Sequence, residues 1–386
     1  MITLSDSQFL TLRHEPYGER HPYLPLPFER SPRDPIANEP VILGVETSHA
    51  PSADAVWCVW RVDGSPTENR TDAWMRTIGE TADQWKIELP AFNDHEVVHY
   101  RLFASNKEQQ VESAEFTFSV TSWIEVVSVI EVEENTHRLV VKLATTHPDL
   151  YLRLLAEPDI AGTLSLKFTA FHETGVFRNT PSITEPVTAE WGEVYLTLTG
   201  NPLRLELIRK SDGLSLQSEG PIRVLVNIDG TVLQYKLGFM SPADEAFYGF
   251  GERFNALDQR GNQLDNYVYG QYTGQGKRTY IPIPFFISSR GYGLWLQTDR
   301  QAEFDLAAAA RDRWAMTGLA EDEDASLEVK FFFQQHPREI VQAFTGLTGK
   351  PKLPPSWVFG PWMSSNDWNS QAEVVRQLHE TQKYEI

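Results

Sequence analysis

The chain has 386 residues, 41% of them apolar and 23% charged, and it is rich in aromatic residues, with 11 Trp, 13 Tyr and 21 Phe. This composition predicts a globular protein of two or three domains and excludes extensive disorder. The formal net charge of −19 at pH 7 argues against nucleic acid or an anionic membrane as a partner, because both select patches of Lys and Arg.

Cysteine usage and the first residues bear on the cellular compartment. Cys58 is the only cysteine, so the chain can form neither an intrachain disulfide nor a cysteine-based metal cluster. The opening residues, MITLSDSQFL, lack the basic and apolar regions of a signal peptide, and no apolar run approaches the length of a membrane span. We therefore expect a cytoplasmic protein that does not interact with a membrane.

The first region of the chain, residues 1–122, is expected to form a β-sandwich. Its lead segment, about residues 1–40, is proline-rich and irregular. Short runs of alternating polarity then follow up to about residue 120, namely AVWCVWRV, WKIELPAF, VVHYRLFAS and AEFTFSV. Turn residues separate these runs. Alternation with a period of two at this spacing predicts an antiparallel sandwich of immunoglobulin size.

The second region, residues 123–348, contains more predicted strands than a small sandwich can hold. Its alternating runs are HRLVVKLA, LYLRLLA, LSLKFTAF, EVYLTLTG, LRLELIRK, IRVLVNI, TVLQYKLGF and YGLWLQT. They predict a large β domain built from two sheets. A helix is expected near its end in REIVQAFTGLTG, where Ile340, Val341, Phe344 and Leu347 share one face.

The period changes after the proline-rich linker KPKLPP, in residues 349–386. The nearly continuous apolar run WVFGPWMSS predicts a strand that is buried on both faces. Val375, Leu378 and Gln382 then recur at helical spacing, and the helix has several possible N-caps, which are Ser364, Ser365, Asn366, Asp367 and Asn369. One strand followed by one helix is the repeating unit of an α/β barrel or a doubly wound sheet.

Residues 244–298 are rich in glycine and aromatic residues, and by themselves they predict only an ordered loop that leaves a β domain. Within and beyond them, FYGFGERFNALDQRG, YIPIPFFISSRGYGLWL and PSWVFGPWMSS occur in the order found in glycoside hydrolase family 31. From residue 123 to its end the chain therefore resembles this family of α-glucosidases, α-xylosidases and transglycosylases. Residues 1–122 resemble an added β-sandwich module.

The resemblance implies a galactose-mutarotase-like β-sandwich followed by a (β/α)8 barrel, of which residues 349–386 would be the truncated start. In the family, a loop of the sandwich reaches over the barrel and binds substrate, and here it corresponds to residues 264–280. Many members carry an Asp in a pattern near W-N-x-D in this loop. Asn266 fits the pattern, but Val268 stands where the Asp would be. Tyr267, Tyr269 or, after a shift of register, Asp265 are the alternatives.

Further substrate contacts are expected at the start of the implied barrel, because barrel active sites lie at the carboxyl ends of the strands. Trp362 is placed to stack on a sugar ring, while Asn366 and Asp367 are placed to accept hydrogen bonds from sugar hydroxyls. The competing interpretation makes Asn366 and Asp367 helix caps. We expect Tyr267 and Tyr269 to converge with these residues on an α-linked carbohydrate, with no cofactor and no metal.

The reacting groups of such an enzyme are not found in this chain. A retaining glycosidase needs two carboxyl groups about 5 Å apart, and no acidic residue here matches either family motif, so no catalytic residue is assigned. We therefore expect the chain alone to lack glycosidase activity. Three alternatives stay open: a truncated glycosidase, a noncatalytic carbohydrate-binding protein, and a member that transfers glycosyl groups to another sugar. Oligomer formation by the full-length enzyme is a further alternative that the sequence leaves open.

A zinc-peptidase pattern also occurs, in the HEVVH run from His95 to His99. That chemistry needs both His side chains on one face of a helix. Here a turn signal precedes the run and the pattern continues as a strand, which separates the two His by roughly 13 Å. The sequence therefore predicts a structural role.

We predict that the purified protein holds no zinc at this pattern, because the two imidazoles are too far apart to share an ion. Metal analysis of the purified chain beside the His99→Ala variant checks this. About one zinc per chain that disappears in the variant would contradict the prediction.

Overall fold

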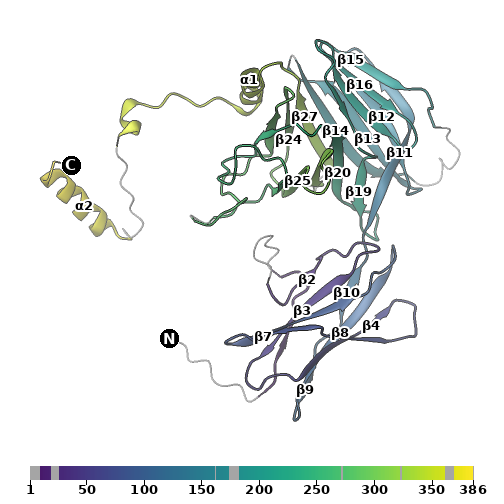
Figure 1. Ribbon diagram of the computed structural model, residues 1–386, viewed down its shortest axis with the longest axis vertical. Helices are drawn as coiled ribbons and strands as arrows, with labels where there is room; N and C mark the ends of the chain where they lie inside the picture. The colour runs from purple at the N-terminus through teal and green to yellow at the C-terminus, as the bar shows by residue number, and fades with distance from the viewer. Residues whose placement is uncertain are drawn as a thin grey trace. The chain divides into compact units, whose positions relative to one another are not determined.

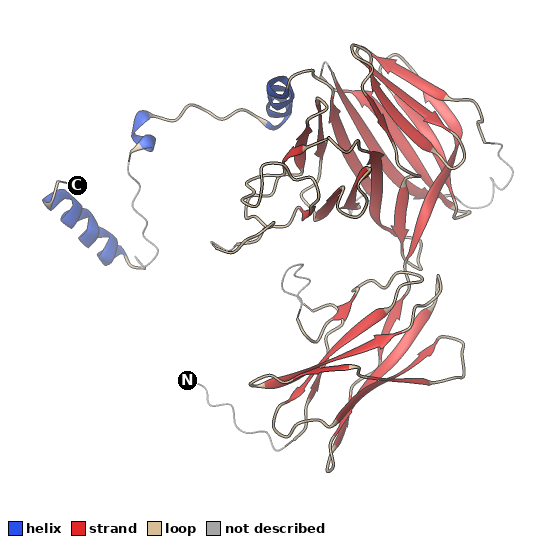
Figure 2. Ribbon diagram, in the orientation of Figure 1, coloured by secondary structure: helices blue, strands red, loops and turns tan. Residues whose placement is uncertain are grey.

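The computed structural model describes residues 9–18, 26–160, 162–173, 182–270, 273–321, 324–360 and 369–385. The chain divides into two units, Met1–Ala343 and Phe344–Ile386. Among the described residues, no helix is long and apolar enough to cross a bilayer. Figure 2 shows that strands make up most of the first unit, while helices dominate what is described of the second.

The strands up to residue 119 form two five-stranded antiparallel sheets within the described residues. One sheet contains β1 (Leu12–Arg13), β2 (Arg30–Ser31), β3 (Val41–Ser48), β6 (Met75–Thr77) and β7 (Ala82–Leu89). The other contains β4 (Ala55–Val62), β5 (Asn69–Asp72), β8 (Val97–Ser105), β9 (Gln110–Glu112) and β10 (Phe116–Ser119). One apolar core includes residues of both sheets, such as Val45 and Ile87 from the first and Cys58 and Leu102 from the second. All four runs predicted here contain a strand.

The HEVVH run does not form the helix that a zinc peptidase needs. His95 lies in a turn with a positive φ of 62°, and β8 begins at Val97. His99 pairs with Arg61 on β4 and Thr117 on β10. Its ring lies within 3.6 Å of the Asp63 carboxylate and 3.3 Å of the Glu115 carboxylate. The strand predicted for this segment is therefore confirmed.

The second group of strands is larger (Figure 1). Within the described residues, one ladder joins thirteen strands in the order β21-β23-β24-β27-β14-β13-β12-β11-β19-β20-β26-β25-β22, and a four-stranded sheet joins β15 to β18. Their bounds are β11 Ser122–Glu134, β12 Leu139–Thr145, β13 Leu150–Pro158, β14 Thr163–His172, β15 Val187–Trp191, β16 Val194–Thr199, β17 Arg204–Arg209, β18 Ser215–Gln217, β19 Arg223–Val226, β20 Val232–Met240, β21 Phe247–Gly249, β22 Gln263–Asp265, β23 Phe285–Ser288, β24 Tyr292–Leu296, β25 Ala302–Leu306, β26 Arg313–Leu319 and β27 Ser326–Phe332.

The long strand β11 allows this ladder to fold over on itself. Near its start, Ser122–Glu125 pairs with β19, and from Val126 onward it pairs with β12. Its register against β12 shifts twice, between Val126 and Ser128 and between Val129 and Glu131. Such irregularities bend and twist a strand. The ladder therefore has two halves, and a single apolar core includes residues of both halves and of the four-stranded sheet. All eight runs predicted in this region contain a strand.

An aromatic cluster joins the two ends of the ladder. Phe247 is the first residue of β21, and Phe250 directly follows that strand. Phe286 lies on the neighbouring β23. Phe304 on β25 and Trp314 on β26 come from the opposite end. The ring centroids of Phe250 and Phe304 lie 5.1 Å apart, and those of Phe286 and Trp314 lie 5.3 Å apart, both pairs edge to face. All five side chains are at most 1% exposed.

Helix α1 (Pro337–Thr348) follows β27 and begins with proline, which has no N–H to satisfy at this position. Ile340 and Ala343 are its buried residues. Ile340 packs so closely on Gly293 of β24 that a Cβ there would clash with it. The predicted helix is confirmed, but its predicted face is partly wrong, since Val341 is 43% exposed.

The second unit differs from the expected start of a barrel. Ser356–Phe359, which includes the first three residues of the predicted strand, forms a 3₁₀ helix, η1, after two prolines. A parallel strand needs a neighbour for its backbone groups, and among the described residues no strand pairs with this segment. The strand prediction is therefore wrong for its first three residues, from Trp357 to Phe359. Trp362, Asn366 and Asp367 lie outside the described residues.

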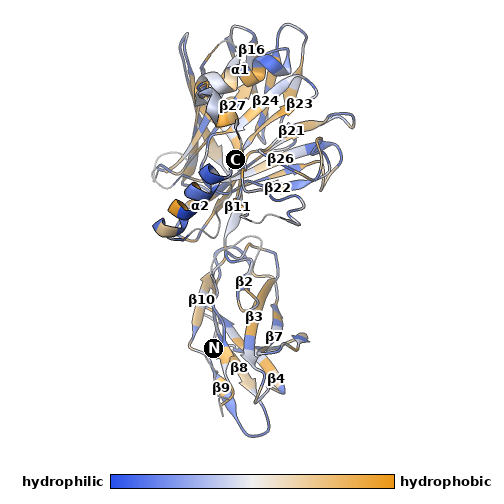
Figure 3. Cartoon of the chain, turned by 90° about the vertical axis from the view of Figure 1, so that its left-hand side faces the viewer, coloured by the Kyte–Doolittle hydropathy of each residue, from blue (hydrophilic) through white to orange (hydrophobic). Residues whose placement is uncertain are grey.

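The predicted helix after this segment is present as α2 (Gln371–Lys383). Its N-cap is Ser370, whose hydroxyl oxygen accepts a hydrogen bond from the Glu373 amide at 3.2 Å. None of the five caps proposed from sequence is used, and the S-x-x-E spacing of Ser370 and Glu373 was the signal for the true one. Figure 3 shows a mainly hydrophilic helix interrupted by a hydrophobic stretch. Leu378 is 57% exposed.

We predict that deleting residues 349–386 reduces self-association and preserves the β structure. Trp357, Phe359 and Leu378 are 67%, 74% and 57% exposed, and burial of such side chains is worth about 2 kcal/mol each. The deletion leaves α1 intact. Sedimentation velocity and far-ultraviolet circular dichroism check the prediction, with the full chain carrying Trp357→Ser and Phe359→Ser as control. A monodisperse unaltered chain, or loss of β signal on deletion, would contradict it.

Candidate functional site

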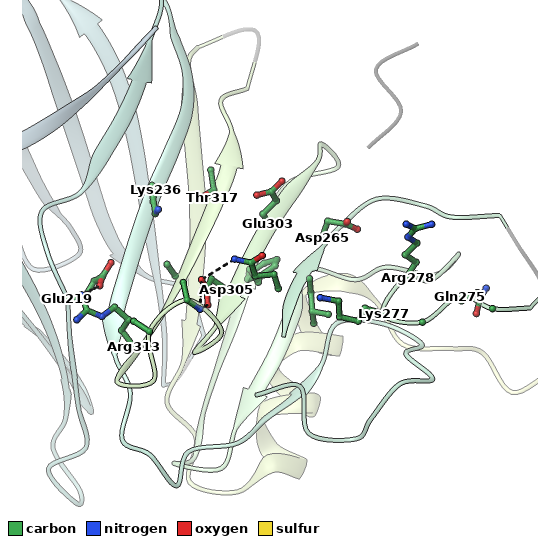
Figure 4. A pocket seen from close by; sticks show the side chains of 18 residues that line it. Glu219, Lys236, Asp265, Gln275, Lys277, Arg278, Glu303, Asp305, Arg313 and Thr317 are labelled. Atoms are coloured by element: carbon green, nitrogen blue, oxygen red, sulfur yellow. Dashed lines mark hydrogen bonds and ion pairs between the residues drawn. The ribbon is translucent and has the colours of Figure 1, made fainter. Parts of the chain in front are cut away.

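A cavity of about 840 Å³ lies against the last strands of the long ladder. Its walls come from β20, β22, β25 and β26, and from the loop that follows β22. Figure 4 shows charged and polar side chains around it. The lining residues used below are Glu219, Lys236, Asp265, Lys277, Arg278, Glu303, Asp305, Arg313 and Thr317.

Alternation along the strands explains why this wall is polar. On β26, Trp314 and Met316 point into the apolar core, whereas Arg313 and Thr317 line the cavity. Successive side chains of a strand point to opposite faces, so the cavity occupies the face that does not contact the core. One face of the sheet thus carries the aromatic side chains of the core, and the opposite face carries the charged side chains of the cavity.

Most of the charged groups in the wall have partners. The Asp305 carboxylate accepts hydrogen bonds from the backbone amides of Ala308, at 2.8 Å, and Ala309, at 3.2 Å. The Arg313 guanidinium donates to the Glu219 carboxylate at 2.7 Å. These groups hold the wall together, and their oxygens are already engaged.

Asp265 is different, because one oxygen of its carboxyl group has no partner. In the part of the chain that the structure describes, Oδ1 of Asp265 is buried without a hydrogen bond. Burial raises the pKa of Asp265 from 3.8 to about 6. The Glu303 carboxylate, its cross-strand neighbour, raises this pKa further, while the Tyr267 backbone amide and the cations of Arg278 and Lys277 lower it. A buried, unsatisfied acceptor beside a cavity is suited to a ligand that donates hydrogen bonds.

The glycine-rich turn before β22 fixes the base of the cavity loop. The Phe250 amide donates to the Phe285 carbonyl at 2.8 Å, and the Glu252 amide donates to the Ile281 carbonyl at 3.1 Å. Gly251 has a φ of 85°, and a Cβ there would collide with the Ile281 carbonyl oxygen. Glycine is required at this position because the two segments approach so closely.

Of the loop residues considered from sequence, some line the cavity and others do not. Asp265 lines it, whereas Tyr267 and Tyr269 do not belong to its wall. The Tyr269 ring lies 4.8 Å from the Arg278 guanidinium, and the Tyr269 amide donates to the Thr279 carbonyl at 2.8 Å. Asn266 also has a buried oxygen without a partner, and Val268 is 58% exposed. The substrate roles of Tyr267, Tyr269 and the residues of the second unit stay predictions.

Sequence reasoning missed several residues of the cavity wall. Lys236 lies on β20, which was predicted, and Glu303 lies on β25, which was not. The sequence did not show which strands pair with these two, or which of their side chains point away from the core. The pairing of Asp265 with Glu303 joins residues that are far apart in sequence. Alternation in AEFDL, with Glu303 and Asp305 flanking Phe304, was the one available signal. Among the described residues, no group of three or more His, Cys, Asp or Glu side chains is placed to hold a metal ion.

Comparison with known proteins identifies the family. Residues 59–305, more than half of the chain, match the model of the glycosyl hydrolase 31 N-terminal galactose mutarotase-like domain. Residues 13–82 match the model described as Lmo2446-like, N-terminal. The chain therefore belongs to glycoside hydrolase family 31, as its motifs suggested, and its second β region is a galactose-mutarotase-like domain.

Individual relatives resemble this chain along nearly all of its length. It is 31% identical to the isomaltosyltransferase of Sporosarcina globispora over 94% of this chain and 34% of that protein. It is 26% identical to the 1,3-alpha-isomaltosidase of Kribbella flavida over 95% of this chain and 41% of that protein. The cycloalternan-forming enzyme of Listeria monocytogenes, solved in complex with a pentasaccharide substrate, superimposes with a TM-score of 0.78 at 30% identity, over 97% of this chain and 36% of that chain. The chain thus spans well under half of these relatives.

We predict that Asp265→Asn stabilises the fold at neutral and higher pH. The pKa of this carboxyl is raised in the folded chain, so folded protein binds the proton more tightly and loses stability as pH rises through about 6. The neutral amide has no charge to bury. Thermal melts should therefore favour the variant above about pH 6 and show little difference below 3.8.

Asp305→Asn is the matched control for this prediction. Its two oxygens accept amide hydrogen bonds, so the substitution should destabilise the fold by about 1 kcal/mol. A lower melting temperature for Asp265→Asn at every pH would show that its carboxylate is a structural partner instead.

Proposed function

We propose that this chain supplies the substrate-side scaffold of an enzyme that acts on α-linked glycosides. The observation that carries the proposal is the cavity loop, in which Asp265 lines a polar cavity and, among the described residues, has one buried carboxyl oxygen without a hydrogen-bond partner. Relatives in the family both hydrolyse and transfer glycosyl groups. The main function we assign is retaining α-glycoside hydrolysis, and the substrate is a carbohydrate.

The chemistry of the cavity suits neutral sugars. A carboxylate accepts hydrogen bonds from hydroxyl groups, and charged acceptors form the stronger bonds. Asp265 and Glu303 provide such acceptors on one side, while Lys277 and Arg278 provide donors on the loop. A sugar hydroxyl both donates and accepts, so it can bind between the two sets. In this proposal Asp265 takes the place of the Asp that is replaced by Val268.

The reaction itself requires groups that this chain has not been found to contain. Retaining hydrolysis needs a nucleophilic carboxylate and a second carboxyl group that donates and accepts the proton. We propose that residues 349–386 begin the (β/α)8 barrel that carries them, with domain boundaries at 122/123 and 348/349. The 3₁₀ helix at Ser356–Phe359 would then become the first barrel strand only when neighbouring strands pair with it.

Transfer to another sugar is the second candidate. It is favoured by the similarity to an isomaltosyltransferase over 94% of this chain. Hydrolysis and transfer share the covalent glycosyl-enzyme step and differ in whether water or a sugar hydroxyl attacks next. Chromatography of products formed from isomaltose separates the two, since transfer yields longer saccharides and hydrolysis yields glucose alone.

The proposal predicts the activity of the whole open reading frame and of its Asp265→Asn variant. Residues 1–386 alone should release no aglycone from aryl α-glycosides, whereas the product of the whole reading frame should. Asp265→Asn should lower kcat/KM by about tenfold or more, as expected for loss of a charged hydrogen bond. Asp324→Asn, which removes an ion pair with Lys167 outside the cavity wall, is the control and should stay within about twofold.

Each alternative has its own outcome. Loss of activity in Tyr267→Phe or Tyr269→Phe, with Asp265→Asn unchanged, would assign the loop contact to a tyrosine. Sugar binding without turnover by the product of the whole reading frame would overturn the enzymatic function in favour of a carbohydrate-binding protein. Release of aglycone by residues 1–386 alone would show that the reacting carboxyl groups lie within this chain.

A further inference from the structure

Arg253 makes hydrogen bonds that connect three separate backbone segments around the cavity loop. Its Nε donates to the Phe250 carbonyl at 3.1 Å, in the glycine-rich turn. One terminal nitrogen, Nη2, donates to the Asp265 carbonyl at 2.6 Å, and the other, Nη1, donates to the Lys277 carbonyl. The guanidinium therefore joins both ends of the loop to the turn that precedes it.

The base from which Arg253 extends is rigid. Phe250 is 1% exposed and stacks with Phe286 at 5.2 Å, and its amide is bonded to the Phe285 carbonyl. The adjoining Gly251 contacts the backbone of Ile281 so closely that no side chain fits. Burial lowers the pKa of the Arg253 guanidinium to about 10, which leaves it positively charged at neutral pH.

The two loop residues that it holds, Asp265 and Lys277, both line the cavity. Arg253 binds their carbonyl oxygens and leaves their side chains available to the cavity. A planar guanidinium can donate in several fixed directions at once, whereas the ammonium of lysine is a single point of charge. The spacing of one acceptor, Asp265, and one donor, Lys277, in the cavity wall therefore depends on the shape of the Arg253 side chain.

We propose that Arg253 is a positioning residue that sets the placement of Asp265 and Lys277 in the cavity wall and, through them, the affinity for the sugar. It does not touch the sugar itself. The second half of this inference rests on the proposed function, since it assumes that the cavity binds a carbohydrate. The first half concerns the loop alone.

The test compares Arg253→Lys with Arg260→Lys in the 386-residue chain. Arg260 is a matched control, because its guanidinium also bridges two backbone carbonyls, those of Glu245 at 3.0 Å and Arg311 at 2.6 Å, but it lies outside the cavity wall and the loop. Hydrogen exchange of peptides covering residues 264–270 and 273–280 reports on the loop. Titration with isomaltose, followed by nuclear magnetic resonance, reports on binding.

Arg253→Lys should raise amide exchange in both loop peptides by about tenfold and weaken isomaltose binding by a similar factor. Arg260→Lys should leave both within about twofold of the unaltered chain. Unchanged loop exchange in Arg253→Lys, or equal effects of the two variants, would overturn the proposal.

The pH dependence of isomaltose binding separates positioning from a general loss of stability. Asp265 faces Glu303 from β25 and Lys277 and Arg278 from the loop, and its pKa of about 6 depends mainly on burial. A looser loop exposes this carboxyl to water, so the midpoint of binding should move down toward the ordinary value of 3.8 in Arg253→Lys. A lower melting temperature with an unmoved midpoint would contradict the positioning role.

Failure of the proposed function gives a different result. If the unaltered chain binds no isomaltose, the carbohydrate assignment is wrong for this chain and the claim about affinity falls with it. Amide exchange in residues 264–270 and 273–280 then decides the remaining claim, which is that Arg253 holds these two parts of the loop.

Discussion

Contact between aromatic rings at the two ends of one strand ladder determines the architecture of the larger β region. Phe247, Phe250 and Phe286 come from one end, and they pack on Phe304 and Trp314 from the other. Each buried ring contributes about 2 kcal/mol by its removal from water, and edge-to-face contacts add to this. The bends in β11 allow the ladder to fold, but these rings determine where its ends meet.

The polar cavity follows from the same contact. Because Phe304 and Trp314 occupy the core face of β25 and β26, Glu303 and Arg313 must point to the opposite face. The ring of Phe250 also anchors the glycine-rich turn from which the cavity loop is held. The site is therefore built on the side of a rigid sheet, and its least satisfied group, Asp265, lies where the last strand gives way to the loop.

The sequence predicted the β architecture well because alternation is a local signal. Every predicted run in the first unit contains a strand, and the family motifs were sufficient to identify the second β region. Long-range pairing was not predictable in this way. The pairing of Asp265 with Glu303, and hence the cavity wall, depends on which strand lies beside β22, and no period in the sequence encodes this. Tyr267 and Tyr269 were preferred over Asp265 because the motif alignment does not tell which loop residue lines the cavity, and their role as substrate contacts stays a prediction.

The errors near the end of the chain have a related cause. The run from Trp357 to Phe359 has the composition of a buried strand, but a strand in a parallel sheet depends on neighbours for its hydrogen bonds. The apolar sequence therefore indicated a segment that suits a buried strand, whereas the segment forms a 3₁₀ helix here. The prediction that Val341 is buried was wrong for a simpler reason. The small residue Ala343 is buried in α1 in place of the larger Val341.

The two terminal strands of the long ladder, β21 and β22, have three residues each. At about 3.3 Å per residue, each offers an open edge only about 10 Å long. Both come from the same glycine-rich segment, and each is followed directly by residues that belong to no strand. A second chain would find too few consecutive backbone groups there to add a strand of its own. The segment that marks the family thus also limits fibril-like growth at the two ends of the long ladder.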